Sequence, residues 1–421
     1  MPYVEDNKLT MNCNSPYSCS AMNREALVQG LSVQTDSKIV LLIIDGLGGM
    51  PVQGKTELEA AYTQHLDRLA LKGCCGLTDP VLMGITPGSG PAHLALFGYD
   101  PVQYQLGRGI LEALGSDIEV TENDLVARGN FATVKNGLVV DRRAGRIPTS
   151  ECEKLCALVN EGLEGKKGTA VRLFPGKEHR FVARFRAEGL SDALTDADPQ
   201  KDNKPFIPAA PTSPESARTA EIVNMFLLEA AEILKPMPVT NGVLLRGFSK
   251  LPSIPKMQDL YKLRPAAIAH YPMYKGLAKL VGMTAYSVGP ETADLFRTLE
   301  THYAERDFFY VHYKKTDAAG EDGNFEAKVR AIEEVDAFIP RLEALKPDVL
   351  VITSDHSTPS LIRGHSWHPN PFLLISQTAI PDNTGVFTER ECAQGFLGRF
   401  PSICAMPLML ANAGKLKKFG A

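Results

Sequence analysis

The chain has 421 residues, more than one hydrophobic core usually supports, so we expect two domains or one domain with a large insertion. Its 44% hydrophobic and 22% charged residues are typical of an ordinary globular protein. The formal net charge of −4 excludes the broad basic surface that binds nucleic acid or an anionic membrane, so an anionic ligand would need a local cluster of Arg and Lys.

The N-terminal stretch 1–21 is polar and has no apolar run suited to a signal peptide or a membrane span, so we expect a disordered extension. The eight cysteines are scattered, without a CxxC pair or the spacing of a zinc site. This pattern predicts reduced core cysteines in a cytoplasmic protein. From the net charge we expect neither a nucleic-acid nor a membrane partner. The oligomeric state stays open, a homo-oligomer included.

Four apolar runs predict buried, parallel strands, and each ends in or near a loop that carries polar residues. These runs are 38–44, 307–312, 348–353 and 371–375. Segments 57–72 and 325–345 have apolar residues at helical spacing. Strands that alternate with helices predict an α/β fold with an open, mostly parallel sheet and helices on both faces.

The middle of the chain has a different pattern. An Asn-Gly turn within 130–140 and a Pro-Gly turn at 175–176 predict two hairpins, with helices near 150–163 and 215–234. We therefore expect 117–287 to be a smaller α+β domain, inserted into a discontinuous α/β domain that is formed by 22–116 and 288–421.

Acidic and histidine residues cluster in the loops that follow the predicted strands. The candidates are Asp45, Asp317, Glu321, Asp355, His356 and His365. Taken singly, each has an ordinary explanation as a turn residue, a solvated acidic loop or a surface histidine. Ligands of open α/β sheets bind at the carboxyl ends of the strands, and hard oxygen ligands with imidazole suit a pair of divalent cations. The set together predicts a metal centre.

Ser89 lies in the segment Gly-Ser-Gly-Pro, directly before a predicted helix. Gly and Pro on both sides predict a sharp turn that exposes the hydroxyl, and the helix N-terminus favours a phosphate. A bound metal would favour the alkoxide and make Ser89 a nucleophile. The alternative is a plain turn before a helix.

The segments LIIDGLGG, ITPGSGPAHLALFGYDP, KKTDAAGEDGNFEAKV, ITSDHSTP and GHSWHPNPFLL follow one another from about Lys38 to Met409. In this order the chain resembles the archaeal-type, 2,3-bisphosphoglycerate-independent phosphoglycerate mutases of the alkaline phosphatase superfamily. The resemblance implies an alkaline-phosphatase-like fold and the interconversion of 3-phosphoglycerate and 2-phosphoglycerate through a phosphoserine, independent of 2,3-bisphosphoglycerate. It extends into the predicted insertion, at NFATV and LLRG.

The resemblance also implies two divalent metal ions, with manganese as the usual cation and magnesium, cobalt or zinc as alternatives. One ion would be held by Asp45, Ser89, Asp355 and His356, and the other by Asp317, Glu321 and His365. Most members of the family have histidine where this chain has Glu321. A carboxylate remains a competent ligand, and we expect it to give the second site a harder character.

By the same resemblance, the inserted domain supplies the cations that hold phosphoglycerate, since arginine forks suit both phosphate and carboxylate. The residues to which this role transfers are Arg128, Arg142, Arg146, Arg246, Lys275 and His179.

Two alternatives to the mutase remain. A metal-dependent phosphatase or another phosphosugar mutase would share the metals and Ser89. The cluster from Arg142 to Arg146 and Lys275 favour the phosphoglycerate mutase. A non-catalytic phosphometabolite-binding protein would explain Glu321 as a decayed ligand. Retention of the other expected ligands argues against decay.

Overall fold

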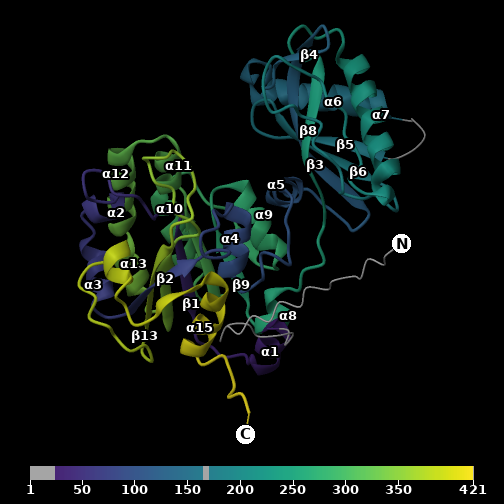
Figure 1. Cartoon of the computed structure of the whole chain (residues 1–421). Helices are drawn as coiled ribbons and strands as arrows, with labels where there is room; N and C mark the ends of the chain where they lie inside the picture. Colours follow the sequence, from purple (N-terminus) through teal and green to yellow (C-terminus); the bar gives the residue numbers. More distant parts are fainter. Residues whose placement is uncertain (1–23, 165–169, 421) are drawn as a thin grey trace, which may run out of the picture.

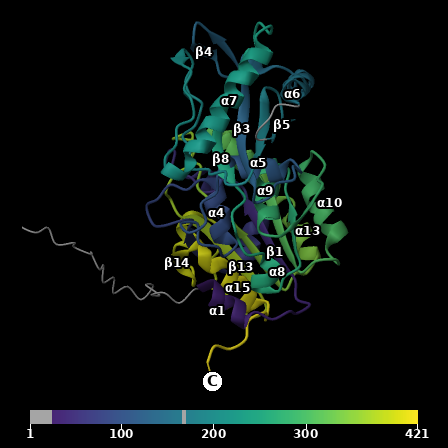
Figure 2. The ribbon, with the colours of Figure 1, turned by 90° about the vertical axis from the view of Figure 1, so that its right-hand side faces the viewer.

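The computed structural model describes residues 24–164 and 170–420, which form two lobes (Figure 1). The expected extension at 1–21 lies outside the described residues, as do Cys13 and Cys19. Figure 2 shows the smaller lobe standing on the larger one, with its own sheet and helices.

A mostly parallel sheet forms the centre of the larger lobe. In the described residues its eight strands are, in order across the sheet, β10 (Thr284–Tyr286), β9 (Pro265–Ile268), β11 (Phe308–Tyr313), β1 (Ile39–Ile44), β12 (Val349–Thr353), β13 (Asn370–Ser376), β2 (Cys74–Asp79) and β14 (Gly398–Pro401). Strand β13 runs antiparallel to both of its neighbours, whereas the other pairs are parallel. The expectation that β13 is parallel was wrong, because an apolar run buried on both faces carries no signal of its direction.

Helices cover both faces of this sheet, which confirms the predicted α/β architecture. In β1, Ile39, Leu41 and Ile43 join one hydrophobic cluster, and the alternate residues join a second on the opposite face. The first cluster includes α1 (Arg24–Leu31), α4 (Ser89–Leu96), α5 (Arg108–Gly115), α8 (Met257–Tyr261), α9 (Pro272–Leu280) and α15 (Ala405–Asn412). The second includes α2 (Glu57–Ala60), α3 (Gln64–Ala70), α10 (Thr292–His302), α12 (Phe325–Asp336), α13 (Ile339–Ala344) and α14 (Glu389–Cys392).

The smaller lobe has an antiparallel sheet and a hydrophobic core of its own. Its described strands are β5 (Ala170–Pro175), β6 (Arg180–Arg186), β3 (Asp124–Lys135), β4 (Leu138–Asp141) and β7 (Lys204–Pro205), with β8 (Gly242–Lys250) also paired to β3. Helices α6 (Thr149–Leu163) and α7 (Ala217–Leu234) contribute buried residues to this core. Both predicted hairpins and both predicted helices are present.

The insertion is shorter than we expected at its C-terminal side. Strands β9 and β10 pair in parallel with each other, and β9 pairs with β11, so both belong to the large sheet rather than to the insertion. The expected boundary at residue 287 therefore does not match the strand pairing, and the chain returns to the larger lobe after β8. The sequence did not reveal this return because β9 is a four-residue apolar strand, too short for a periodic signal.

Helices α5 and α9 cross closely near the junction of the lobes (Figure 1). A Cβ atom at Gly276 would lie 2.0 Å from the carbonyl oxygen of Leu111, and one at Gly115 would lie 1.8 Å from that of Pro272. Two glycines therefore let the helix backbones touch. Helix α5 also packs against β3 and β8, so it contacts both lobes.

We expect Gly276→Ala to lower the midpoint of thermal unfolding by several degrees, because its methyl group would overlap a backbone atom that cannot move aside cheaply. Gly30→Ala is the matched control, since a Cβ at this position in α1 meets nothing within 4 Å. A calorimetric scan of both variants checks the prediction. Equal midpoints of the two variants would show that the contact between α5 and α9 can accommodate a methyl group.

Candidate metal and phosphoryl-transfer site

The acidic centre lies where neighbouring strands of the large sheet end. Asp45 follows β1, Asp355 follows β12, and Asp317 lies in α11 (Lys315–Glu321), just after β11. Because β11, β1 and β12 are adjacent and parallel, their carboxyl ends meet at one edge of the sheet. All three carboxylates are buried.

Among the described residues, two groups of side chains have the geometry to hold a cation, and they share one histidine. The first is Asp45, Asp355 and His356, and the second is Asp317, His356 and His365. Within each group the ligand atoms lie within 4.8 Å of one another. The predicted metal ligands other than Glu321 and Ser89 are thus gathered in these two overlapping groups.

Ser89 begins α4 and reaches the first group. Gly88, in an extended conformation, precedes the helix, and the Ser89 Oγ lies 3.2 Å from Nε2 of His356. The hydroxyl thus stands at a helix N-terminus and beside the acidic centre. This is where an attacking oxygen and an incoming phosphate would meet.

Hydrogen bonds fix the tautomers of both histidines. His365 Nδ1 is 2.9 Å from the carbonyl oxygen of Pro87, which can only accept, so this nitrogen carries the proton. Thr358 donates to Asp317 at 2.6 Å and therefore accepts from Nδ1 of His356 at 3.0 Å. Nε2 of each neutral histidine is then unprotonated, which is the form that binds a metal.

The charges of the centre are unbalanced within the protein. Burial acts to raise the pKa of Asp45, but the Lys314 ammonium and the His312 ring outweigh it and hold this pKa well below its usual value. Burial raises the pKa of Asp355 well above its usual value, and the neighbouring Asp45 carboxylate adds to the shift. Asp45 Oδ1 and Asp355 Oδ2 are buried without a hydrogen-bond partner. Two buried carboxylate oxygens without hydrogen-bond partners, beside an unprotonated imidazole nitrogen, suit a divalent cation as ligands.

Glu321 lies at the rim of the centre rather than inside it. Its side chain is 56% exposed, and its Oε1 is 4.0 Å from Nε2 of His365. Partial burial of the side chain raises the pKa of Glu321, and the nearby Asp317 carboxylate adds to this shift. The position is within reach of the second group, at the end of α11.

The smaller lobe carries a pair of arginines on adjacent strands. Arg128 of β3 lies opposite Arg246 of β8, and the Nε atoms of both are buried without a hydrogen-bond partner. Burial lowers the pKa of Arg128; the Glu112 carboxylate opposes this shift, and the charges of Arg246, Arg180 and Arg108 add to it. Two neighbouring guanidinium groups with unpaired Nε atoms have the chemistry to bind an anion.

The other predicted substrate residues are placed differently. Arg142 is engaged within the lobe, with Nε 3.0 Å from Asp198, and Arg146 is exposed at the end of a short 3-10 helix, Ala144–Arg146. His179 is buried, and Lys275 lies on α9 in the larger lobe. The structure thus brings Arg128 and Arg246 together and leaves Arg142 with an internal carboxylate partner.

Lys314, His312 and Tyr274 belong to the centre, and sequence reasoning missed them. Lys314 lies 3.0 Å from Asp45 and also contacts Asp317. His312 and Lys314 occupy alternate positions at the end of β11, just before Asp317, and this spacing was an available signal. Tyr274 is 229 residues from Asp45 in sequence, and no motif marks it.

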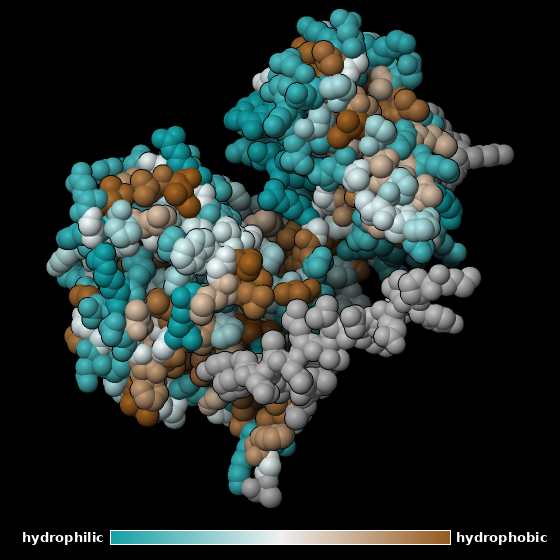
Figure 3. Space-filling model, in the orientation of Figure 1, coloured by the Kyte–Doolittle hydropathy of each residue, from teal (hydrophilic) through white to brown (hydrophobic). Residues whose placement is uncertain are grey.

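Figure 3 shows an open cleft between the lobes, with largely hydrophilic residues on the wall of the smaller lobe.

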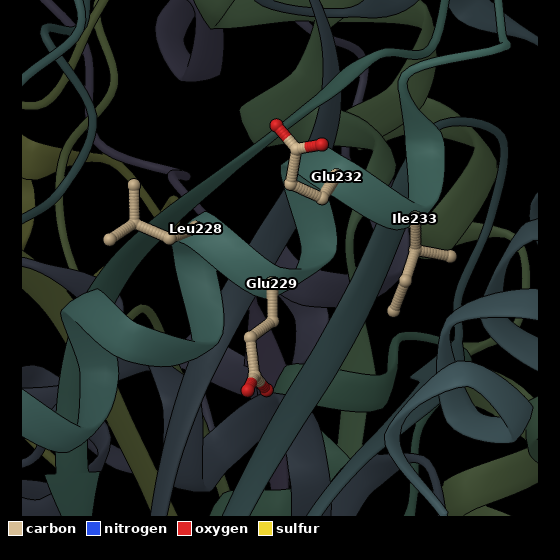
Figure 4. Close-up of a pocket in the computed structure, with 4 residues that line it drawn as sticks. All are labelled: Leu228, Glu229, Glu232 and Ile233. Carbon is tan, nitrogen blue, oxygen red and sulfur yellow. The ribbon is translucent and has the colours of Figure 1, made fainter.

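A separate hollow of about 450 Å³ lies on α7, lined by Leu228, Glu229, Glu232 and Ile233 (Figure 4). Its described lining has two carboxylates and no cation, so it does not suit a phosphorylated ligand. Among the described helices, none has the length and apolarity needed to cross a bilayer.

We expect Thr358→Val to weaken the binding of a divalent cation about tenfold, since it removes the hydroxyl that orients both His356 and Asp317. Thr78→Val is the matched control, because the Thr78 hydroxyl is buried without a hydrogen-bond partner. Calorimetric titration with manganese measures the difference. Equal affinities of the two variants would contradict the orienting role.

Comparison with known proteins shows to which family the chain belongs. The model of the 2,3-bisphosphoglycerate-independent phosphoglycerate mutase family matches residues 70–240. A probable enzyme of this name from Thermosipho africanus is 52% identical over 401 residues, which cover 95% of this chain and 100% of the relative. One from Thermotoga maritima is 53% identical over 399 residues, with the same coverage.

Among solved structures, the cofactor-independent phosphoglycerate mutase of Thermoplasma acidophilum has a TM-score of 0.70 and 30% identity, over 90% of this chain and 100% of that one. A Pyrococcus horikoshii protein has a TM-score of 0.78 and 30% identity, over 92% and 100% of the two chains. Identity above one half over nearly the whole length leaves one conclusion: the chain belongs to the 2,3-bisphosphoglycerate-independent phosphoglycerate mutase family.

Proposed function

We propose that the protein interconverts 3-phosphoglycerate and 2-phosphoglycerate through a phosphoserine at Ser89, without 2,3-bisphosphoglycerate. The observation that carries the proposal is the position of the Ser89 hydroxyl, 3.2 Å from His356 at the N-terminus of α4 and beside the buried carboxylates. The relatives from Thermosipho africanus and Thermotoga maritima, which are probable phosphoglycerate mutases, support this choice of substrate.

The proposed ligands of two divalent cations are Asp45, Ser89, Asp355 and His356 for one, and Asp317, Glu321 and His365 for the other. Carboxylate oxygen mixed with imidazole nitrogen suits manganese, which is the cation we propose. When bound, the cations would lower the pKa of the serine hydroxyl and neutralise charge on the transferring phosphoryl group. Glu321 would complete the second site from the rim, where its flexible side chain lies within reach of His365.

The chemistry is two transfers in sequence. Ser89 Oγ forms a bond to phosphorus as the bond to the 3-oxygen of the substrate breaks, and that oxygen leaves as a hydroxyl. Glycerate then turns so that its 2-oxygen attacks the phosphoserine and restores the Ser89 hydroxyl. Atoms and protons balance over the two steps, and no second phosphate donor is consumed.

Arg128 and Arg246 would hold the anionic substrate from the side of the smaller lobe. Their guanidinium groups are half-buried, and the Nε atom of each has no hydrogen-bond partner in the protein, so an anion would supply the missing acceptor. Water must be kept from the phosphoserine while glycerate turns, because hydrolysis would release free phosphate. Closure of the cleft by the smaller lobe would serve this purpose.

We also propose that the enzyme works in the cytoplasm. The described cysteines are free thiols, and all but Cys404 are buried. Unpaired, buried thiols are typical of a reducing compartment.

We expect Ser89→Ala to abolish formation of 2-phosphoglycerate from 3-phosphoglycerate, in an assay with manganese and without 2,3-bisphosphoglycerate that also follows free phosphate. Ser402→Ala is the matched control, because the Ser402 hydroxyl is buried without a hydrogen-bond partner and its loss should leave the rate unchanged. If the unmodified protein released only free phosphate, it would be a phosphatase. If Ser89→Ala kept its rate, the phosphoserine would be wrong.

We expect Arg246→Gln to lower kcat/KM about 10- to 100-fold, since a charged hydrogen bond to a buried anion contributes about 1.5–3 kcal/mol. Arg218→Gln, at an exposed position on α7 of the same lobe, should stay within about twofold. Steady-state kinetics with 3-phosphoglycerate measure both. Equal effects would show that the Arg128–Arg246 pair is not the anion site.

A further inference from the structure

Tyr274 lies beneath the acidic centre, on α9, and its side chain is nearly inaccessible, with 1% of the residue surface exposed. Its hydroxyl lies 2.5 Å from Oδ2 of Asp45. A phenol buried against a carboxylate that is a proposed metal ligand has no role in the reaction as described so far.

The direction of this hydrogen bond is determined by Lys314. The Lys314 Nζ is 3.0 Å from the Tyr274 hydroxyl, and an ammonium group can only donate. The phenolic oxygen therefore accepts from Lys314, and its single proton is committed to Asp45.

The two oxygens of Asp45 consequently have different surroundings. Oδ2 receives the Tyr274 proton and has Nζ of Lys314 and Nε2 of His312 each at 3.0 Å. Oδ1 is buried, has no hydrogen-bond partner and lies 3.4 Å from Nε2 of His356. One oxygen is held by the protein, and the other faces the ligand group.

The phenol ring itself is held in place. It stacks on His312, with 3.7 Å between the ring centroids and 28° between the planes, and it lies 5.1 Å from the ring of His93. Helix α9, which carries it, is fixed against α5 by the glycine contacts at Gly115 and Gly276. A side chain with locked neighbours can hold a carboxylate within the narrow range of angles that a metal site needs.

We propose that Tyr274 is a positioning residue, which turns Asp45 so that Oδ1 faces the divalent cation and Oδ2 stays with the protein. The proposal deepens the proposed function, because it rests on the cation site that Asp45, Asp355 and His356 form. It assigns the phenol to metal affinity rather than to contact with phosphoglycerate.

The test is Tyr274→Phe, which removes one oxygen and keeps the ring. Tyr310→Phe is the matched control, since Tyr310 is also fully buried, lies 5.9 Å from the His312 ring, and has a hydroxyl without a hydrogen-bond partner. Metal-free protein, prepared with a chelator, is titrated with manganese by calorimetry and by the paramagnetic resonance of free manganese. Thermal unfolding of the metal-free variants shows whether either change disturbs the fold.

We expect manganese to bind one of the two sites about tenfold more weakly in Tyr274→Phe, and within about twofold of the original affinity in Tyr310→Phe. The unfolding midpoints of the two metal-free variants should agree within a few degrees. Unchanged manganese affinity in Tyr274→Phe, or an equal loss in both variants, would overturn the proposal.

These outcomes separate the inference from the proposed function. If the unmodified protein fails to convert 3-phosphoglycerate but Tyr274→Phe still weakens manganese binding, the proposed function fails and the role of Tyr274 stands. If the unmodified protein converts phosphoglycerate and Tyr274→Phe binds manganese normally, the inference alone fails.

Discussion

Three buried carboxylates at one edge of the large sheet are the constraint on which the rest of the site depends. Like charges repel strongly where water is excluded, and Lys314 is a single positive charge among Asp45, Asp317 and Asp355. Such a cluster persists only if cations complete it or protons neutralise it. The parallel strands β11, β1 and β12 enforce the proximity, because their carboxyl ends cannot separate without breaking the sheet.

The fold also places the arginines that we propose to bind the anion and the proposed metal ligands in different lobes. Arg128 and Arg246 lie on strands of the insertion, whereas the carboxylates lie on the large sheet. Helix α5 touches both, since Gly109 packs against the carbonyl oxygens of Val126 and Gly247 and the helix crosses α9 at Gly276. Helix α9, which carries Tyr274, thus packs against α5, the helix that contacts both lobes.

Much of this arrangement could be predicted from the sequence. Long apolar runs such as 38–44 and 348–353 identify buried strands, and acidic residues directly after them identify a ligand-binding edge. The direction of β13 and the return of β9 to the large sheet could not be predicted, because a short apolar strand is buried in the same way in either setting. Tyr274 could not be found either, since its partner Asp45 is brought to it only by the tertiary fold.

In the proposed reaction the phosphoryl group is transferred to Ser89 and then back to glycerate. The most direct measurement mixes the manganese-loaded protein with 3-phosphoglycerate, quenches the reaction in acid within milliseconds, and locates phosphate by mass spectrometry of the digested chain. We expect phosphate on the peptide that contains Ser89, formed and lost at rates no slower than turnover. Formation of 2-phosphoglycerate with Ser89 unmodified at every time, or with phosphate on another residue, would contradict it.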